Sequence, residues 1–164
     1  MEPLAPVRRD DATELWRQYT ATRPHQPPED EPAVEQFGDH AALADELLDL
    51  VLAGTKRATA GLVADFAHEG APLPRIGGHW IACDSTGHPR AVLRTTELRL
   101  GRLHSVDDAF AWDEGEDDRT RDSWLRGHLG YFTRTQQARG EAWDDDLEVV
   151  FERFRVVWPP EVAD

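Results

Sequence analysis

A lysine and a threonine stand three residues apart in the segment Gly54 to Thr59, where a predicted helix ends and a predicted strand begins. At such a junction the side chains of Lys56 and Thr59 can converge on one cavity. A partly desolvated lysine has a lowered pKa and can take a proton from a hydroxyl, which makes the hydroxyl nucleophilic. We therefore predict Lys56 as a proton acceptor and Thr59 as a nucleophile. The alternative is that Lys56 and Arg57 only complement the negative end of the preceding helix dipole.

The use of basic residues supports a special role for this lysine. Lys56 is the only lysine among 18 basic residues, and all the others are arginine. Burial can lower the pKa of an amine, whereas a guanidinium group effectively stays charged. A position that requires an amine rather than a charge alone would explain the exception.

A lysine and threonine pair needs a third group to protonate the leaving atom, and a carboxylic acid with a raised pKa can do this near neutral pH. Glu114 is the candidate, because it lies in an acidic turn beside Gly115 and close to Glu116 and Asp118. Repulsion between these like charges should raise at least one of their pKa values. The alternative is a solvated acidic turn without chemistry.

Trp124, His128 and Phe132 follow one another at helical spacing. We expect their rings to pack against a barrel and His128 to lie near the rim of a cleft. The alternative is a core histidine that is hydrogen-bonded to a backbone carbonyl. The other histidines are scattered singly, without zinc-site spacing, so no metal site is expected. Dinucleotide, Walker and esterase motifs are absent as well, and no cofactor is expected.

The net charge of −14 limits the kinds of partner that the protein can bind. Such a field repels polyanions, so RNA is possible but disfavoured, and a small-molecule or nucleotide ligand is the expected partner. No apolar run approaches the roughly 20 residues that span a bilayer, and the N-terminus lacks signal-peptide order. We therefore expect a cytoplasmic protein with no membrane partner. With the single Cys83 no internal disulfide can form.

Hydrophobic residues make up 40% of the 164 residues, which is enough for the core of one domain. We expect an N-terminal helix and a Pro-rich linker over about residues 10–36, and a core over about residues 37–158. Asp39 is a plausible N-cap of the best-defined helix, with Gly54 just past its end. Further helices are predicted at 106–112 and 120–139, and strands at 58–63, 78–84, 89–100 and 147–158. This order indicates an α+β fold.

The order and spacing of several short motifs resemble the ASCH family within the PUA-like group, in particular a bacterial branch of unknown function. The resemblance spans roughly Leu15 to Val157. The motifs are Phe37-Gly38, Ala44 to Leu47, Gly54 to Thr59, Pro74 to Gly77, Arg94 to Thr96, Glu114 to Asp118, Trp124 to His128 and Glu152 to Phe154.

This resemblance implies a small PUA-like β-barrel with helices packed against it and a cleft beside the Lys56 segment. Smaller family members, similar to this chain only in the core, are amidohydrolases that remove the acetyl group from acetylated cytidine. Their lysine, threonine and glutamate map onto Lys56, Thr59 and Glu114. The expected function is thus an amidohydrolase-like reaction on a modified nucleoside or a similar small molecule.

The alternative is a non-catalytic RNA-binding or nucleotide-binding module. In that case Lys56, Arg57 and Arg94 would hold phosphate, and Trp124 or Trp112 would stack on a base. For either function, the candidate substrate-binding residues are Phe37, Arg57, Arg94, Glu116, Trp124 and His128.

Overall fold

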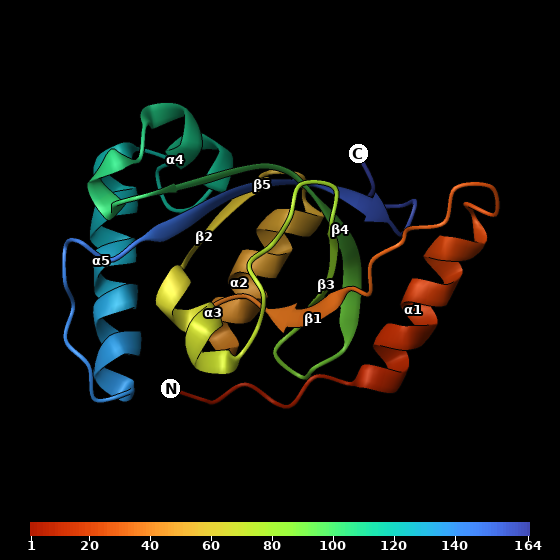
Figure 1. Ribbon diagram of the computed structural model, residues 1–164, viewed down its shortest axis with the longest axis horizontal. Helices are drawn as coiled ribbons and strands as arrows, with labels where there is room; N and C mark the ends of the chain where they lie inside the picture. Colours follow the sequence, from red (N-terminus) through yellow and green to blue (C-terminus); the bar gives the residue numbers. More distant parts are fainter.

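The computed structural model describes residues 1–164 and shows an α+β arrangement, as predicted. One curled five-stranded sheet forms a half-barrel with helices around it (Figure 1). The helices are α1 (Arg9–Ala21), α2 (Ala41–Leu52), α3 (Val63–Glu69), α4 (Asp108–Glu114), α5 (Arg121–Ala138) and the short 3-10 helix η1 (Leu103–Ser105). The strands are β1 (Ala33–Gln36), β2 (Ala58–Leu62), β3 (His79–Cys83), β4 (Pro89–Gly101) and β5 (Val149–Trp158).

The strand order is β1-β3-β4-β5-β2. Only β1 and β3 are parallel, and the other neighbours are antiparallel. The long strands β4 and β5 pair from Val92 with Trp158 to Gly101 with Val149, and the register shifts between Thr95 and Glu97. Such irregularities bend a strand and increase its twist. The predicted barrel is therefore curled but open, with β1 and β2 as its two edges.

The N-cap of helix α2 lies one residue after the predicted one. His40 is the N-cap, and its Nδ1 accepts a hydrogen bond of 3.3 Å from the Leu43 amide. Asp39, the predicted cap, instead accepts two hydrogen bonds of 2.7 and 2.9 Å from the Arg134 guanidinium on α5. The prediction failed because a distant bidentate partner stabilises this carboxylate better than a local amide does. Past the helix end, Gly54 has a positive φ of 86°, as expected for a helix stop.

Side chains on β3 alternate between two apolar clusters. Ile81 and Cys83 pack with residues of α1. Ala82 belongs to the cluster formed with α2. Since successive side chains of a strand point to opposite faces, helices α1 and α2 cover opposite faces of this part of the sheet.

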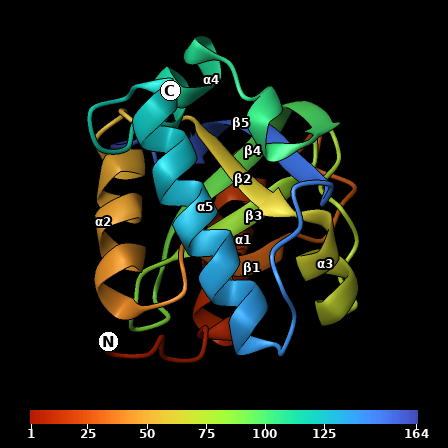
Figure 2. The same ribbon diagram turned by 90° about the vertical axis from the view of Figure 1, so that its left-hand side faces the viewer.

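A third cluster joins α4 and α5 to strands β2 and β5. Figure 2 shows α5 nearest to the viewer, beside β2. The rings of Trp124 and Phe132 are buried in this cluster, and Trp124 stacks on Phe151 with a centroid distance of 5.9 Å. The aromatic stripe thus packs against the sheet as predicted.

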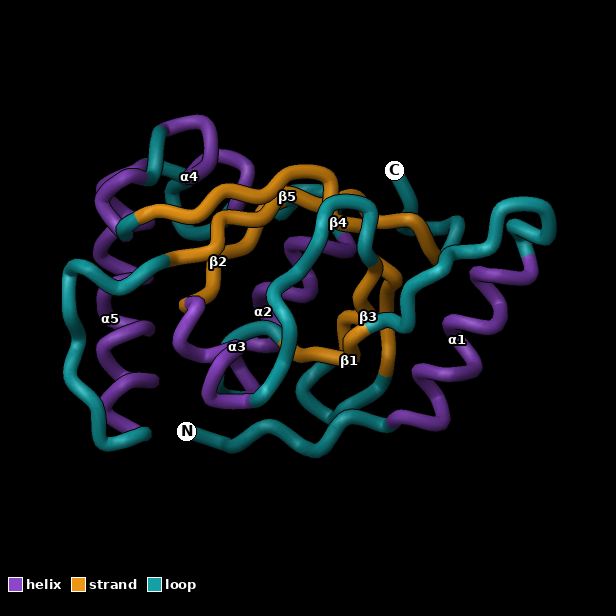
Figure 3. The backbone as a smooth tube through the Cα atoms, viewed as in Figure 1, coloured by secondary structure: helices purple, strands orange, loops and turns teal.

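Besides the short helix η1, two elements were not predicted. Residues 33–36, at the end of the expected linker, form the edge strand β1, and α3 follows β2 directly. The loop of residues 70–78 after α3 then passes in front of the sheet to reach β3 (Figure 3). None of the helices is both long and apolar enough to span a bilayer.

Replacing Phe132 by Ala should lower the free energy of unfolding by about 3–5 kcal/mol, because a fully buried ring is removed from the α5 cluster. Leu129→Ala on the same helix is the control, since that side chain is 38% exposed and should cost less than about 1 kcal/mol. Urea denaturation measures both. Equal losses in the two variants would contradict this packing.

Candidate functional site: a buried ion cluster beside a sheet pocket

The end of α2 positions Lys56. The amides of Thr55 and Lys56 both donate to the Leu50 carbonyl, at 2.9 and 3.0 Å, which closes the helix. The next amide, Arg57, donates to the Asp113 carbonyl at 2.7 Å and ties this segment to the end of α4.

Gly115 allows the acidic turn to approach the Lys56 segment. Its φ is 72°, in the left-handed region that favours glycine, and a Cβ atom there would lie 2.7 Å from the Thr55 carbonyl oxygen. Any other residue would have to move the turn away. The glycine after Glu114 is therefore needed to bring the acidic turn against the Lys56 segment.

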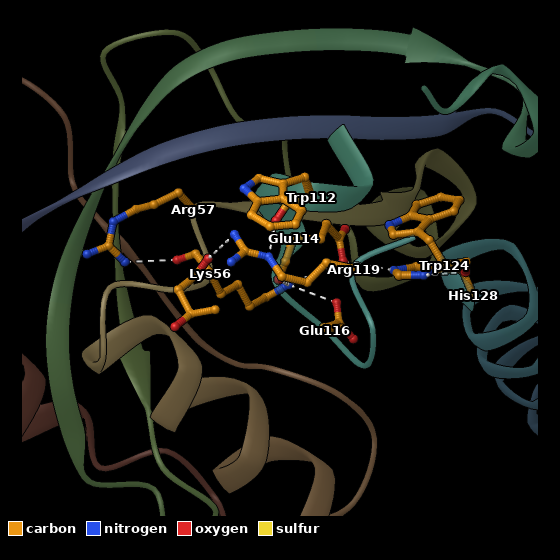
Figure 4. A network of polar contacts seen from close by, with 9 residues as sticks. Lys56, Arg57, Trp112, Glu114, Glu116, Arg119, Trp124 and His128 are labelled. Carbon is orange, nitrogen blue, oxygen red and sulfur yellow. Dashed lines mark hydrogen bonds and ion pairs between the residues drawn. The ribbon is translucent and has the colours of Figure 1, made fainter. Parts of the chain in front are cut away.

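Four side chains form what we call the ion cluster: Lys56, Glu114, Glu116 and His128 (Figure 4). The Lys56 Nζ lies 3.3 Å from Glu114 Oε2 and 3.0 Å from Glu116 Oε2. Lys56 and Glu114 are almost completely buried, whereas the Glu116 side chain is 23% exposed. Lys56 is thus directed inward and faces carboxylates, but it is fully buried and lines neither of the two main pockets, so the expected position in the same cavity as Thr59 is wrong.

His128 is held at both ring nitrogens. Nδ1 lies 3.0 Å from the Trp124 carbonyl oxygen, which can only accept, so Nδ1 carries a proton. Nε2 lies 3.2 Å from Glu114 Oε2, and a charged carboxylate there also requires an N–H. Burial alone would lower the pKa of His128, but Glu114 outweighs it and the pKa is raised. His128 is both a core histidine bonded to a backbone carbonyl and a partner of Glu114.

The charges in the cluster reverse two expectations. Burial alone would lower the pKa of Lys56, but Glu114 and Glu116 outweigh burial and raise it. Burial likewise opposes ionisation of Glu114, but Lys56 and His128 hold its pKa well below the ordinary value. The predicted lowering for Lys56 and the raised pKa favoured for Glu114 are therefore wrong, because neither group is buried without opposite charges.

The acidic turn does contain one carboxyl with a raised pKa, as like-charge repulsion predicted. Burial, with a further contribution from the Glu114 carboxylate, raises the pKa of Glu116 to about 7 against the opposing effect of Lys56. A carboxyl with such a pKa can exchange a proton near neutral pH.

Thr59 lies elsewhere, in a pocket of about 340 Å³ between the sheet, α3 and the loop after α3, which we call the sheet pocket. No hydrogen bond joins Thr59 to Lys56. Thr59 pairs in register with Glu152 of β5, and the Thr95 hydroxyl donates to Glu152 Oε1 at 2.6 Å. The aromatic and polar side chains of its lining include Phe37, Thr59, Phe66, Trp80, Thr95, Tyr131 and Glu152.

Phe37 separates the ion cluster from the sheet pocket. Its ring lines the pocket, and the Lys56 Nζ lies 5.7 Å from the ring centroid. Lys56, Glu114 and His128 do not line the pocket. The structure therefore brings Lys56 and Glu114 together and leaves Thr59 in the neighbouring pocket.

Arg57 satisfies the end of α2. Its Nη1 donates to the Val51 carbonyl at 2.8 Å, and its other nitrogens bind the Asp164 carboxylate. Arg57 and not Lys56 therefore interacts with the end of the preceding helix, as the alternative interpretation expected. Arg94 lies apart from the ion cluster and the sheet pocket, and it lines a second pocket.

The two tryptophans considered for base stacking have other partners. Trp124 is buried and stacks on His128 at a centroid distance of 3.9 Å. Trp112 is exposed, and the Arg119 guanidinium lies 3.9 Å from its ring centroid. Neither ring lines the sheet pocket.

Glu114, Glu116 and His128 offer donor atoms within 4.8 Å of one another, a spacing that a metal ion could use. In this structure, however, the Lys56 ammonium contacts both carboxylates. His128 also needs its Nε2 proton to face Glu114. The cluster is thus arranged around an ammonium group of the protein itself.

The fold and these two sites define a PUA-like half-barrel protein with a buried ion cluster behind a pocket on the sheet. The family model of the ASCH domain matches residues 33–158, so the chain belongs to the ASCH family.

Two solved structures are similar to this chain. One is the ASCH domain from Lactobacillus crispatus JV V101, with a TM-score of 0.80 and 24% identity over 92% of this chain and 96% of the other. The other is a protein from Enterococcus faecalis V583, with a TM-score of 0.81 and 25% identity over 91% and 89% of the two chains. No curated protein matches the sequence.

Replacing Lys56 by Met should lower the free energy of unfolding by about 3–5 kcal/mol, because it leaves buried carboxylates without their ammonium partner. Arg102→Met is the matched control, since it removes an ion pair with Asp146 whose side chains are 69% and 74% exposed. The control should cost less than about 1 kcal/mol. Denaturant titration at neutral pH compares the two, and a mild effect of Lys56→Met would show that the cluster does not depend on this charge.

Glu116 should make stability depend on pH in a defined window. Its pKa is about 7 in the folded protein against an ordinary 4.5, so the folded state holds a proton that the unfolded state releases. The resulting stabilisation is complete below pH 4.5 and is lost as the pH rises through 7. The stability of the wild type relative to Glu116→Gln should therefore fall across this window. Glu161→Gln, at an exposed site, should track the wild type, and parallel curves for all three proteins would rule out this titration.

Proposed function

We propose that this protein binds a nucleoside or a nucleotide of similar size, with the base in the sheet pocket. The observation that carries the proposal is the lining of this pocket, which combines aromatic rings with polar side chains from adjacent strands that have free hydrogen-bonding capacity. Membership of the ASCH family and the PUA-like fold support a ligand of this class.

The size and the aromatic lining suit a flat heterocycle. A volume of about 340 Å³ lies at the lower end of the range of small-molecule sites. Phe37 and Trp80 form an aromatic corner with a centroid distance of 5.1 Å, and Phe66 and Tyr131 lie on other walls. Stacking of a base on such rings contributes about 1–3 kcal/mol.

Glu152 can form a directional hydrogen bond with a ligand in the pocket. One carboxyl oxygen accepts from Thr95 at 2.6 Å. Burial raises the pKa of Glu152, against the effects of the Thr95 hydroxyl and the Trp80 indole N–H, which both face the carboxyl. The Trp80 Nε1 atom is buried and has no acceptor at regular hydrogen-bond distance. The carboxyl therefore keeps acceptor capacity for a base that presents an amino group.

The charge of the pocket favours the base over the phosphate. The lining carboxylates are Asp30, Glu31, Glu35, Asp65, Glu69 and Glu152, against Arg75 and His79 as the basic residues. Such a wall repels an anion placed within it. The sheet pocket is therefore assigned to the uncharged or cationic part of the ligand.

Hydrolysis of an acylated nucleoside is the second candidate. The observation in its favour is that the unbonded Thr59 hydroxyl stands in register with the Glu152 carboxyl inside the pocket. Lys56 is held as an ammonium group by two carboxylates, so it is a poor proton acceptor for Thr59. In this hydrolytic mechanism Thr59 is the nucleophile and Glu152 is the proton acceptor. The pair of Lys56 and Glu114 then only supports the wall of the pocket behind Phe37.

Calorimetric titration with cytidine, uridine, adenosine and guanosine tests the binding proposal. Glu152→Gln should weaken the preferred nucleoside by about tenfold or more, because a charged hydrogen bond is lost. Thr96→Val is the control, since Thr96 is exposed on the same sheet and does not line the pocket. Equal affinities for all three proteins, or no binding of any nucleoside, would refute the proposal.

Thr59→Val separates the two candidates. If the protein only binds, this variant should keep an affinity within a few-fold of the wild type and no acetylcytidine turnover should be seen in either protein. If the protein is a hydrolase, the variant should still bind but lose turnover, because the nucleophile is gone. Chromatographic detection of released acetate and cytidine gives the readout.

A further inference from the structure

A second pocket, of about 620 Å³, adjoins the sheet pocket. It lies between the end of α1, the Pro-rich loop that follows, the loop before β3, and the place where His79 of β3 pairs with Arg94 of β4. Three arginines line it from three separate segments: Arg23 after α1, Arg75 in the loop before β3, and Arg94 on β4. We call it the arginine pocket.

These three guanidinium groups are exposed and have no hydrogen-bond or ion-pair partner within the protein, unlike those of Arg57, Arg134 and Arg153. Arg134, for example, forms a bidentate pair with Asp39. By contrast, no ion pair or hydrogen bond within the protein holds the guanidinium group of Arg23, Arg75 or Arg94. Three like charges around one hollow repel each other, and an anion between them would relieve that repulsion.

The nearby acid is already engaged. Asp30 lines the arginine pocket, but its Oδ2 accepts from the His79 backbone amide at 2.7 Å and its Oδ1 lies 3.0 Å from His79 Nδ1. On the other side, His79 Nε2 lies 3.4 Å from the Tyr19 hydroxyl. Asp30 is therefore bound to the wall. Glu29 is the other acid of the lining, so three arginines stand against one carboxylate without a protein partner.

The two pockets share part of their lining. Asp30, Arg75, Gly78 and His79 line both of them. A single ligand can therefore extend from the aromatic and acidic sheet pocket past His79 to the arginines. The opposite charge of the two pockets matches a ligand with an uncharged base at one end and an anion at the other.

We propose that the arginine pocket binds the phosphate group of a nucleoside monophosphate whose base occupies the sheet pocket. The inference rests on the proposed function and names the ligand class more closely. Guanidinium groups bind phosphate oxygens through paired N–H donors, which suits three arginines that converge from different segments. A mononucleotide is favoured over an RNA strand because a chain with net charge −14 repels a polyanion more strongly than a single phosphate.

Titration of the preferred nucleoside and of its 5′-monophosphate with the full chain is the first test. The monophosphate should bind about tenfold tighter or more, and added salt should reduce this advantage, since screening acts on the charged group alone. Inorganic phosphate should bind weakly and compete with the monophosphate, but it should not compete with the nucleoside.

Arg23→Gln and Arg94→Gln address the site itself, because both residues line only the arginine pocket. Each variant should lose about tenfold in affinity for the monophosphate and keep the affinity for the nucleoside. Arg126→Gln on α5 is the control, an exposed arginine that lines neither pocket. It should behave as the wild type with both ligands.

The outcomes separate this inference from the proposed function. If the nucleoside binds and the monophosphate gains nothing, the phosphate site is refuted and the base site stands. If no nucleoside binds but phosphate does, in an Arg94-dependent way, the base site fails and an anion site remains, so the mononucleotide assignment is overturned. A single-stranded RNA that binds more tightly than the monophosphate, with the same arginine dependence, would also overturn that assignment.

Discussion

The contact on which the site depends is the buried ammonium of Lys56 between the carboxylates of Glu114 and Glu116. Removing one partner of a buried ion pair costs about 3–5 kcal/mol, because the other charge is left buried and unpaired. The folded state must therefore bring together three segments: the end of α2, the turn after α4, and His128 on α5. The backbone is fitted to this need. Gly115 lets the acidic turn reach Thr55, and the Arg57 amide is bonded to the end of α4.

This arrangement separates strong charge from ligand chemistry. The ion cluster lies behind Phe37, where its ammonium and imidazolium groups are neutralised by carboxylates and do not line the sheet pocket. The pocket itself presents Thr59 and Glu152, which come from adjacent strands of a rigid sheet. A site on strands keeps its side chains more precisely placed than a site on loops. The cluster thus determines the shape of one wall while the sheet supplies the contacts.

Local patterns allowed much of the fold to be predicted, whereas the site required long-range contacts. The helices and long strands have clear periodicity, but β1 has four residues and α3 starts without a side-chain cap. Lys56 and Glu114 were identified from residue type and motif. The directions of their pKa shifts could not be predicted, because they depend on the contact between two side chains that are 58 residues apart in the sequence. Glu152 did have a signal: it stands between Val150 and Phe154 on the buried phase of β5, where an acid is unusual.

The acidic net charge and an anion site are compatible because they act over different distances. In physiological salt the Debye length is about 8 Å, so the many carboxylates on other faces contribute little at the arginine pocket, whereas the groups that line the pocket are screened less. An RNA strand, which runs over many such distances, meets the acidic faces as well as the arginines. A single phosphate meets only the charges that line the pocket, which are the three arginines with Glu29 and the engaged Asp30. The distribution of charge therefore favours short anionic ligands without requiring a basic surface, and it places three arginines without ion-pair partners in the protein beside the pocket that can hold a base.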